Sequence, residues 1–327
     1  MIETATGPVT AAELGRTITH EHVFINLLPE FRGNGLLNDA DLARRELELF
    51  RDAGGGTIVD LTSAELTVGA SPDPLGLFRG EPAGLPTTQQ TRAHNNVIEL
   101  RDVSAATGVH IVLGTGHYRD PYLNDFDRFG PDLLAERMIE DLTAGFPGTG
   151  VKAGVIGEIG SDRWYLSAAE ERSFRAAARA QVATGVVIST HASRWPVGLA
   201  QLDVLEAEGA DPARVIIGHS DSVNIPEYHL ALARRGVFVQ FDTVRGENEY
   251  ETARRVRYVL ELVRAGFGER ILLSQDVCRK DHLATFGGPG YGYVLGGFRE
   301  RLIDAGLDEA EVDRFFLDNP HHALDGA

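Results

Sequence analysis

The sequence predicts an α/β fold, a single (β/α)₈ TIM barrel, from three observations. Eight short segments rich in β-branched residues recur along the 327 residues. Amphipathic segments lie between them, with apolar positions three and four residues apart, as in helices that cover a core. Strands and helices that alternate in this way form a parallel sheet. Eight such units in a chain of about 300 residues fit a closed barrel better than an open doubly wound sheet.

Each expected strand is a short apolar run, because barrel strands are buried on both faces. The eight expected strands span residues 17–26, 55–62, 110–118, 152–159, 185–193, 214–221, 237–244 and 271–277. The expected helices span residues 39–54, 95–108, 133–145, 168–185, 197–209, 225–236 and 251–268. Several of these helices end in glycine, which is typical of helix C-termini. The sequence contains no internal repeat and no linker, so residues 1–327 are expected to form one domain.

Two long connections interrupt this alternation. Residues 64–94, rich in proline and glycine, follow the second strand, and residues 278–297 follow the eighth. The connections at the C-terminal ends of barrel strands surround the active site. Long irregular connections there are often functional, and disorder is the plainer alternative. We expect the 64–94 segment to be an inserted loop that could act as a lid or a specificity element.

Composition excludes several classes of function. The net charge of −17 would repel nucleic-acid phosphates. The sequence has no apolar run of about 18 residues that could span a membrane, and its N-terminus lacks a signal-peptide pattern. The single cysteine, Cys278, allows no internal disulfide. We therefore expect a cytoplasmic protein with a small-molecule substrate and neither a nucleic-acid nor a membrane partner.

The most informative motif is His20-Glu21-His22 in the first expected strand. Successive side chains of a strand point to opposite faces, so His20 and His22 point the same way. Two imidazoles on one face can converge on one divalent cation. Taken alone, such a motif in an apolar strand is more often unrelated to metal.

Four further polar residues, Glu158, His191, His219 and Asp276, lie near the C-terminal ends of other expected strands. Burying a carboxylate or an imidazole is costly unless it is paired or bound to metal. A single buried histidine is usually a hydrogen-bonded core residue. Four histidines and two carboxylates at equivalent positions of five strands instead indicate a metal site. These nitrogen and oxygen ligands suit zinc better than calcium or magnesium.

Several motifs together resemble the phosphotriesterase family of the amidohydrolase superfamily, over nearly the whole chain. They are GRTITHEHV, VKAGVIGEIG, STHAS, IIGHSD and LLSQDV. Many members bridge two metals with a carboxylated lysine at the fourth strand, where this chain has Gly157-Glu158. The chain therefore resembles the glutamate-bridged phosphotriesterase homology and phosphotriesterase-related proteins. Lys152 is six residues earlier, roughly 20 Å along an extended strand, which argues against a lysine bridge.

The resemblance implies a centre of two divalent metal ions, with zinc expected first and manganese or cobalt as alternatives. His20, His22 and Asp276 would hold the more buried ion, and His191 and His219 the more exposed one. Glu158 would bridge both ions together with a hydroxide. Asp276 would also be catalytic, accepting the proton of that hydroxide and passing it to the leaving group. A helix N-cap is the plainer role for Asp276. Resemblance also implies a homodimer.

Substrate contacts are expected from residues just after strands. Arg245, Arg279 and Lys280 could each bind a carboxylate, phosphate or sulfonate, and the Tyr118 hydroxyl could point into the pocket. An arginine on a loop is more often simply solvated.

The leading hypothesis is a metal-dependent hydrolase that uses a metal-bridging hydroxide on a lactone or another carboxylic ester. Weak phosphotriesterase activity is expected beside it. The first alternative is an amidohydrolase acting on an N-acyl amine. The others are a metal-containing binding protein without turnover and a structural, metal-free histidine cluster.

Overall fold

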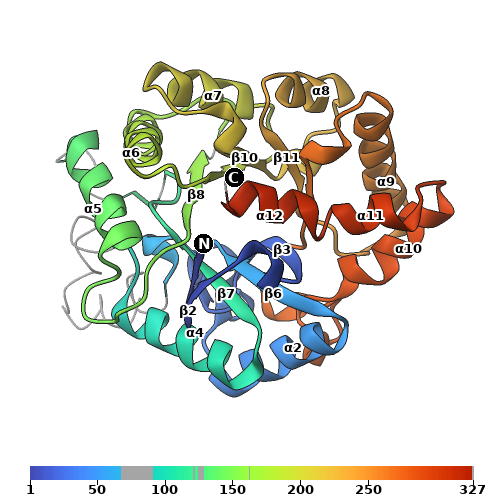
Figure 1. Ribbon diagram of the computed structural model, residues 1–327, viewed down its shortest axis with the longest axis horizontal. Helices are drawn as coiled ribbons and strands as arrows, with labels where there is room; N and C mark the ends of the chain where they lie inside the picture. Colours follow the sequence, from blue (N-terminus) through green and yellow to red (C-terminus); the bar gives the residue numbers. More distant parts are fainter. Residues whose placement is uncertain (68–90, 121, 124–128, 162, 326–327) are drawn as a thin grey trace.

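The computed structural model describes residues 1–67, 91–120, 122–123, 129–161 and 163–325. Eight parallel strands form one sheet, in the order β3-β6-β7-β8-β9-β10-β11-β12 (Figure 1). Their bounds are β3 Arg16–Glu21, β6 Gly55–Asp60, β7 His110–Thr115, β8 Val155–Ser161, β9 Ile188–Ala192, β10 Val215–Gly218, β11 Phe238–Phe241 and β12 Ile271–Leu273. The sheet order follows the chain order, and each strand corresponds to one expected from sequence.

The first and last strands meet and close the barrel. The backbone N–H of His20 donates to Ser274 Oγ at 2.9 Å, and the N–H of Asp276 donates to the His20 carbonyl at 3.1 Å. The prediction of a (β/α)₈ barrel is confirmed.

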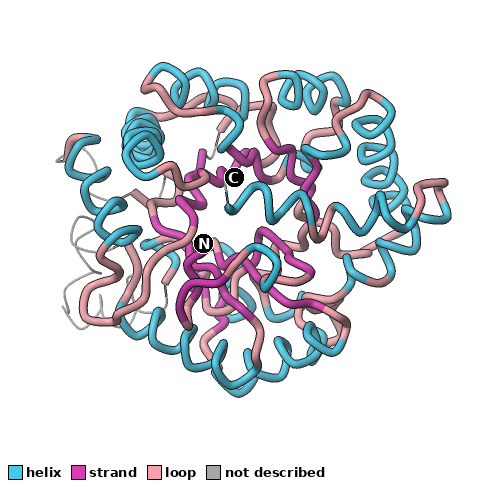
Figure 2. Tube along the Cα trace, in the orientation of Figure 1, coloured by secondary structure: helices cyan, strands magenta, loops and turns pink. Residues whose placement is uncertain are grey.

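Helices surround the strands on the outside (Figure 2). The seven expected helices are present as α2 Ala40–Asp52, α4 His94–Thr107, α5 Pro131–Thr143, α6 Ala168–Thr184, α7 Gly198–Ala207, α8 Pro226–Arg234 and α9 Glu249–Arg264. Further helices not expected from the sequence are α1 Leu28–Phe31, α10 Gly297–Asp304, α11 Glu309–Arg314 and α12 Asp318–Asp325. None of the helices in the described ranges is both long and apolar enough to cross a membrane.

The first expected strand, 17–26, is shorter than predicted. Strand β3 ends at Glu21, and Ile25–Asn26 form a separate strand, β4, that pairs antiparallel with β5 (Leu36–Leu37). An additional hairpin, β1 (Ile2–Thr4) with β2 (Gly7–Val9), precedes the barrel.

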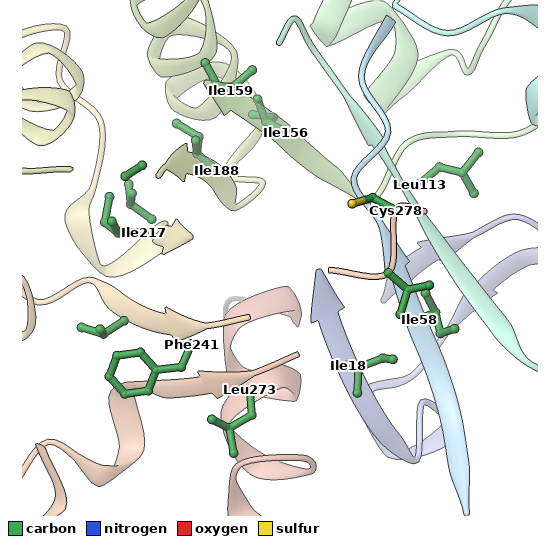
Figure 3. Close-up of a cluster of buried hydrophobic side chains, with 14 of the residues drawn as sticks. Ile18, Ile58, Leu113, Ile156, Ile159, Ile188, Ile217, Phe241, Leu273 and Cys278 are labelled. Carbon is green, nitrogen blue, oxygen red and sulfur yellow. The ribbon is translucent and has the colours of Figure 1, made fainter. Parts of the chain in front are cut away.

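Two apolar layers make up the core. The outer layer lies between strands and helices, and Figure 3 labels at least one of its side chains from each of the eight barrel strands. The inner layer fills the barrel and includes Val59, Val155 and Phe238, together with Ile2 from β1 and Leu324 from α12. Helix α12 crosses one end of the barrel, near both termini (Figure 1). The functional residues are therefore confined to the other end.

The two ends of the expected 64–94 insertion are buried against the barrel. Residues 64–66 form a buried 3₁₀ turn, and Arg92 is fully buried. The Arg92 guanidinium donates to Asp60 Oδ1 at 2.6 Å and to the Gly114 carbonyl at 2.8 Å. Residues 68–90 lie outside the described part of the chain, so the insertion remains a prediction.

A buried carboxylate in helix α5 should make stability depend on pH. Burial raises the pKa of Asp141 to about 7, although a hydrogen bond from the Thr115 hydroxyl, at 2.7 Å, and the nearby His117 and Arg92 oppose this shift. Between about pH 4 and 7 the unfolded chain releases this proton while the native state keeps it, so stability falls as pH rises. We expect the free energy of unfolding of Asp141→Asn, relative to that of wild type, to rise by roughly 1–3 kcal/mol from pH 5 to pH 8. Urea unfolding at both pH values would measure this gain.

The matched control is Asp132→Asn, because Asp132 is an exposed acid in the same helix. A pH-independent difference between Asp141→Asn and wild type would show that Asp141 titrates normally in the native state.

Candidate metal centre

The six residues expected to bind metal lie together at the C-terminal ends of the barrel strands. His20 is on β3, Glu158 on β8 and His191 on β9. His22 and His219 directly follow β3 and β10, and Asp276 is the third residue after β12. Four of the six are almost fully buried, and the side chains of His191 and Asp276 are 12% and 15% exposed. Residues distant in sequence thus converge on one water-poor site.

Glu158 lies at the centre of this cluster. Its Oε2 atom is 3.0 Å from His191 Nδ1, 3.3 Å from His20 Nε2 and 3.6 Å from His219 Nε2. Its Oε1 atom is 3.7 Å from His22 Nε2. The two carboxylate oxygens therefore face different histidines. His22 Nε2 is also 3.3 Å from Asp276 Oδ1, so the carboxylates of Glu158 and Asp276 both lie near the same ring nitrogen.

Two groups within the described residues could each hold a cation. His20, Glu158 and His219 form one group, and His20, His22 and Asp276 form the other, with ligand atoms within 4.8 Å of one another in each. Both ring nitrogens of His20 are buried without a well-formed hydrogen bond to any described residue. An imidazole in this state fits a metal ligand, because burying unsatisfied polar atoms is costly. The donor set of imidazole and carboxylate fits zinc and similar ions.

The electrostatics of the cluster point the same way. Burial favours neutral His20, but the carboxylates of Asp242 and Glu158 outweigh it and raise the pKa of His20 well above its usual range. Burial and the nearby His219 lower the pKa of His191 to about 4. Burial opposes protonation of His219 as well, yet Asp242 raises its pKa to about 10. The buried carboxylates thus favour positive charge at His20 and His219, and bound cations would supply such charge.

Asp242 orients two of the expected ligands, a role that the sequence analysis missed. Its carboxylate accepts hydrogen bonds from His219 Nδ1 at 2.7 Å and from the His219 backbone N–H, and lies 2.9 Å from His20 Nδ1. Gly218 leaves room for this carboxylate, because a Cβ there would be 3.1 Å from Asp242 Oδ2 and 2.3 Å from the Thr190 carbonyl. A carboxylate behind a histidine fixes its ring orientation for metal binding.

Lys152 lies away from the centre. Its Nζ atom is 3.4 Å from Glu3 of β1, at the end of the barrel that α12 covers. This placement agrees with a glutamate rather than a modified lysine between the metals.

A cavity of about 680 Å³ opens above the cluster. Of the residues expected to contact substrate, Tyr118, Arg245 and Arg279 line this cavity, and Lys280 does not. The Tyr118 hydroxyl is 3.4 Å from His191 Nδ1. Arg245 donates from Nη2 to Asp276 Oδ2 at 2.6 Å, so its guanidinium is engaged beside the cluster.

Arg194 also lines the cavity and was not anticipated from the sequence. Its backbone has φ 69°, and its N–H donates to Ser222 Oγ at 2.7 Å. No described residue forms an ion pair or hydrogen bond with its guanidinium. Its only sequence signal is its place three residues after His191, beyond the fifth barrel strand.

A TIM barrel with clustered histidines and carboxylates at the C-terminal ends of its strands defines a class of barrel hydrolases, and the comparisons with known proteins specify which. The chain belongs to the phosphotriesterase family, whose model matches residues 1–71 and 83–324. It is a hydrolase of that family. The residues described above are candidate ligands for the metals of this family.

Three relatives illustrate the range of the family. The phosphotriesterase homology protein of Escherichia coli is 36% identical over 70% of this chain and 83% of its own length. An N-acetyltaurine hydrolase of Dictyostelium discoideum is 27% identical over 99% of this chain and 97% of its own. The structure of a lactonase from Listeria monocytogenes superposes with a TM-score of 0.82 and 26% identity, covering 99% of this chain and 98% of the lactonase.

Proposed function

We propose that this protein is a binuclear metal-dependent hydrolase that acts on a lactone or another carboxylic ester, with zinc as its native metal. The observation that carries the proposal is the position of Glu158. One buried carboxylate lies 3.0 to 3.7 Å from four imidazoles and directs its two oxygens to different histidines. This arrangement suits a carboxylate that bridges two cations.

The roles of the residues follow from their positions. Two bound cations would supply an activated water and polarise the oxygen of the scissile group. Burial raises the pKa of Asp276, but Arg245 and the neighbouring histidines together hold it well below its usual range, so this carboxylate is ionised at neutral pH. Oδ2 is held by Arg245, whereas Oδ1 faces the cluster and can accept a proton. Asp276 can then pass that proton to the leaving group.

The cavity supports an ester or lactone substrate with an apolar part. Ile25, Leu27, Phe31 and Leu66 are among the residues that line it. Such a surface would bind an acyl chain or a lactone ring through its apolar area. The similarity to a lactonase over nearly the whole chain favours this substrate class.

A second candidate is an N-acyl amine with an anionic substituent. Arginines 119, 194, 245 and 279 line the cavity, in a protein whose net charge is −17. Arg119 pairs with Glu30, Arg245 with Asp276 and Arg279 with Asp281. Among the described residues this leaves the guanidinium of Arg194 for a ligand anion. Guanidinium groups bind carboxylates and sulfonates through paired hydrogen bonds. Similarity to N-acetyltaurine hydrolases over 99% of the chain favours this candidate.

A substrate screen would test both candidates. The metal-loaded enzyme would be assayed with lactones of increasing alkyl length, with simple carboxylic esters and with a phosphotriester. N-acyl amines would be tested in matched pairs, with and without a carboxylate or sulfonate on the amine half. We expect turnover of lactones or esters that is lost on chelation and restored by zinc, with at most weak phosphotriester hydrolysis.

The screen separates the alternatives. Turnover confined to the anionic N-acyl amines, and weakened by Arg194→Ala, would select the second candidate. Arg44→Ala is the control, since Arg44 is a half-exposed arginine of α2 outside the cavity lining. Turnover that survives complete metal removal would contradict the proposed mechanism.

A further inference from the structure

Glu21, the middle residue of the His20-Glu21-His22 motif, is a fully buried carboxylate without a role in the mechanism above. Because strand residues alternate in direction, its side chain points away from the face that carries the two histidines. The hydrogen-bond donors to its carboxylate instead lie just after β12. Oε1 accepts from the Ser274 hydroxyl at 2.7 Å and from the Gln275 N–H at 2.8 Å, and Oε2 accepts from the Val277 N–H at 2.7 Å.

These contacts surround Asp276 on both sides. The residue before it and the residue after it both donate their backbone N–H to Glu21, and Asp276 donates its own N–H to the His20 carbonyl at 3.1 Å. Three consecutive N–H groups of the eighth-strand connection are therefore held by two consecutive residues of the first strand.

The backbone at Asp276 needs such support. Its φ is 48°, in the left-handed region that non-glycine residues seldom adopt. A conformation of this kind persists only where the surroundings over-determine it. The result is that Asp276 Oδ1 lies 3.3 Å from His22 Nε2, within one of the two candidate cation groups.

We propose that Glu21 is a positioning residue that fixes Asp276 relative to His20 and His22, so that metal affinity depends on a carboxylate that touches no metal. This inference rests on the proposed metal centre. One three-residue segment then supplies two ligands directly and places a third, which comes from the opposite end of the chain. The contacts that close the barrel between β3 and β12 thus also position the metal ligands.

The test compares Glu21→Gln with Glu46→Gln. The Gln side chain keeps one acceptor oxygen for Ser274 and Gln275, but places an amide N–H against the N–H of Val277. Glu46 is an apt control because it is equally buried and accepts two N–H groups and one hydroxyl, from Ala284 and Thr285 in the same connection. Both variants should lose similar stability, whereas only Glu21 flanks a metal ligand.

Metal affinity, measured by competition with a chromophoric chelator well below the unfolding temperature, is the deciding readout. We expect Glu21→Gln to bind zinc about 10–100-fold more weakly at one of two sites, the range seen for partners behind metal ligands. We expect Glu46→Gln to match wild type. Ser274→Ala removes the hydroxyl that donates to Glu21 and should also weaken zinc binding. This second variant keeps the test possible if Glu21→Gln does not fold.

Unchanged affinity in Glu21→Gln or Ser274→Ala, or an equal loss in Glu46→Gln, would overturn the proposed role of Glu21. Either result would leave the metal-dependent function intact. Absence of zinc binding by wild-type protein would instead refute the metal centre itself, so the two failures are distinguishable.

Discussion

Replacing Glu158 with alanine is expected to lower the metal content from about two ions per chain and to abolish hydrolysis. The Glu158 carboxylate is 2% exposed and faces four imidazoles. Its removal would take away the negatively charged ligand that both cations would share. Because Glu158 would bind metal directly, the loss of affinity should exceed the ~10–100-fold caused by losing a partner behind a ligand.

Elemental analysis of protein purified without chelator, for wild type and Glu158→Ala, measures this effect. Asp141→Asn provides the control, because it neutralises a buried carboxylate that lies in helix α5 and belongs to neither cation group. A full complement of two metals in Glu158→Ala would remove Glu158 from the bridging position. Absence of metal from wild type, even after reconstitution with zinc, manganese or cobalt, would remove the whole mechanism.

The second large effect is expected from Asp276→Asn. The amide oxygen of Asn can still face His22 and remain a ligand, but the amide cannot accept a proton. Proton transfer by a positioned side chain typically contributes about 10²–10⁴-fold to the rate, so kcat should fall by roughly that factor. The number of bound metals should change little.

Steady-state kinetics and metal analysis on the same preparation would check this result. Asp132→Asn, an exposed substitution of the same type, controls for nonspecific effects. Retention of both metal and activity in Asp276→Asn would favour a metal-containing protein in which Asp276 has no catalytic part. Loss of metal together with activity would show instead that Asp276 acts mainly as a ligand.

Much of the candidate centre could be anticipated from the sequence, because its signal is local. A polar residue at the end of a strand that should be apolar is visible in a single short segment, as with Glu158 in VIGEIG and His219 in IIGHS. The same rule applied to the segment VQFDT would also have found Asp242, which follows strand β11. Only its partners, His20 and His219, required the structure.

The role of Arg245 illustrates the opposite case. The sequence placed it after the seventh strand, where a free guanidinium could bind a substrate anion. In the fold its Nη2 donates to the side chain and the backbone carbonyl of Asp276, 31 residues later. Arg194, by contrast, lines the cavity without such a partner among the described residues. Which arginine is committed to the protein depends on neighbouring connections around the barrel, and sequence spacing does not encode this.

The sequence by itself therefore determined the barrel and the set of expected ligands, because apolar periodicity and misplaced polar residues are properties of short segments. The tertiary structure alone decided which side chains face each other across the barrel mouth. Glu21 shows the difference most clearly. The hydrogen-bond partners of its carboxylate are more than 250 residues away, and they meet it only because closing the barrel brings the first strand against the last.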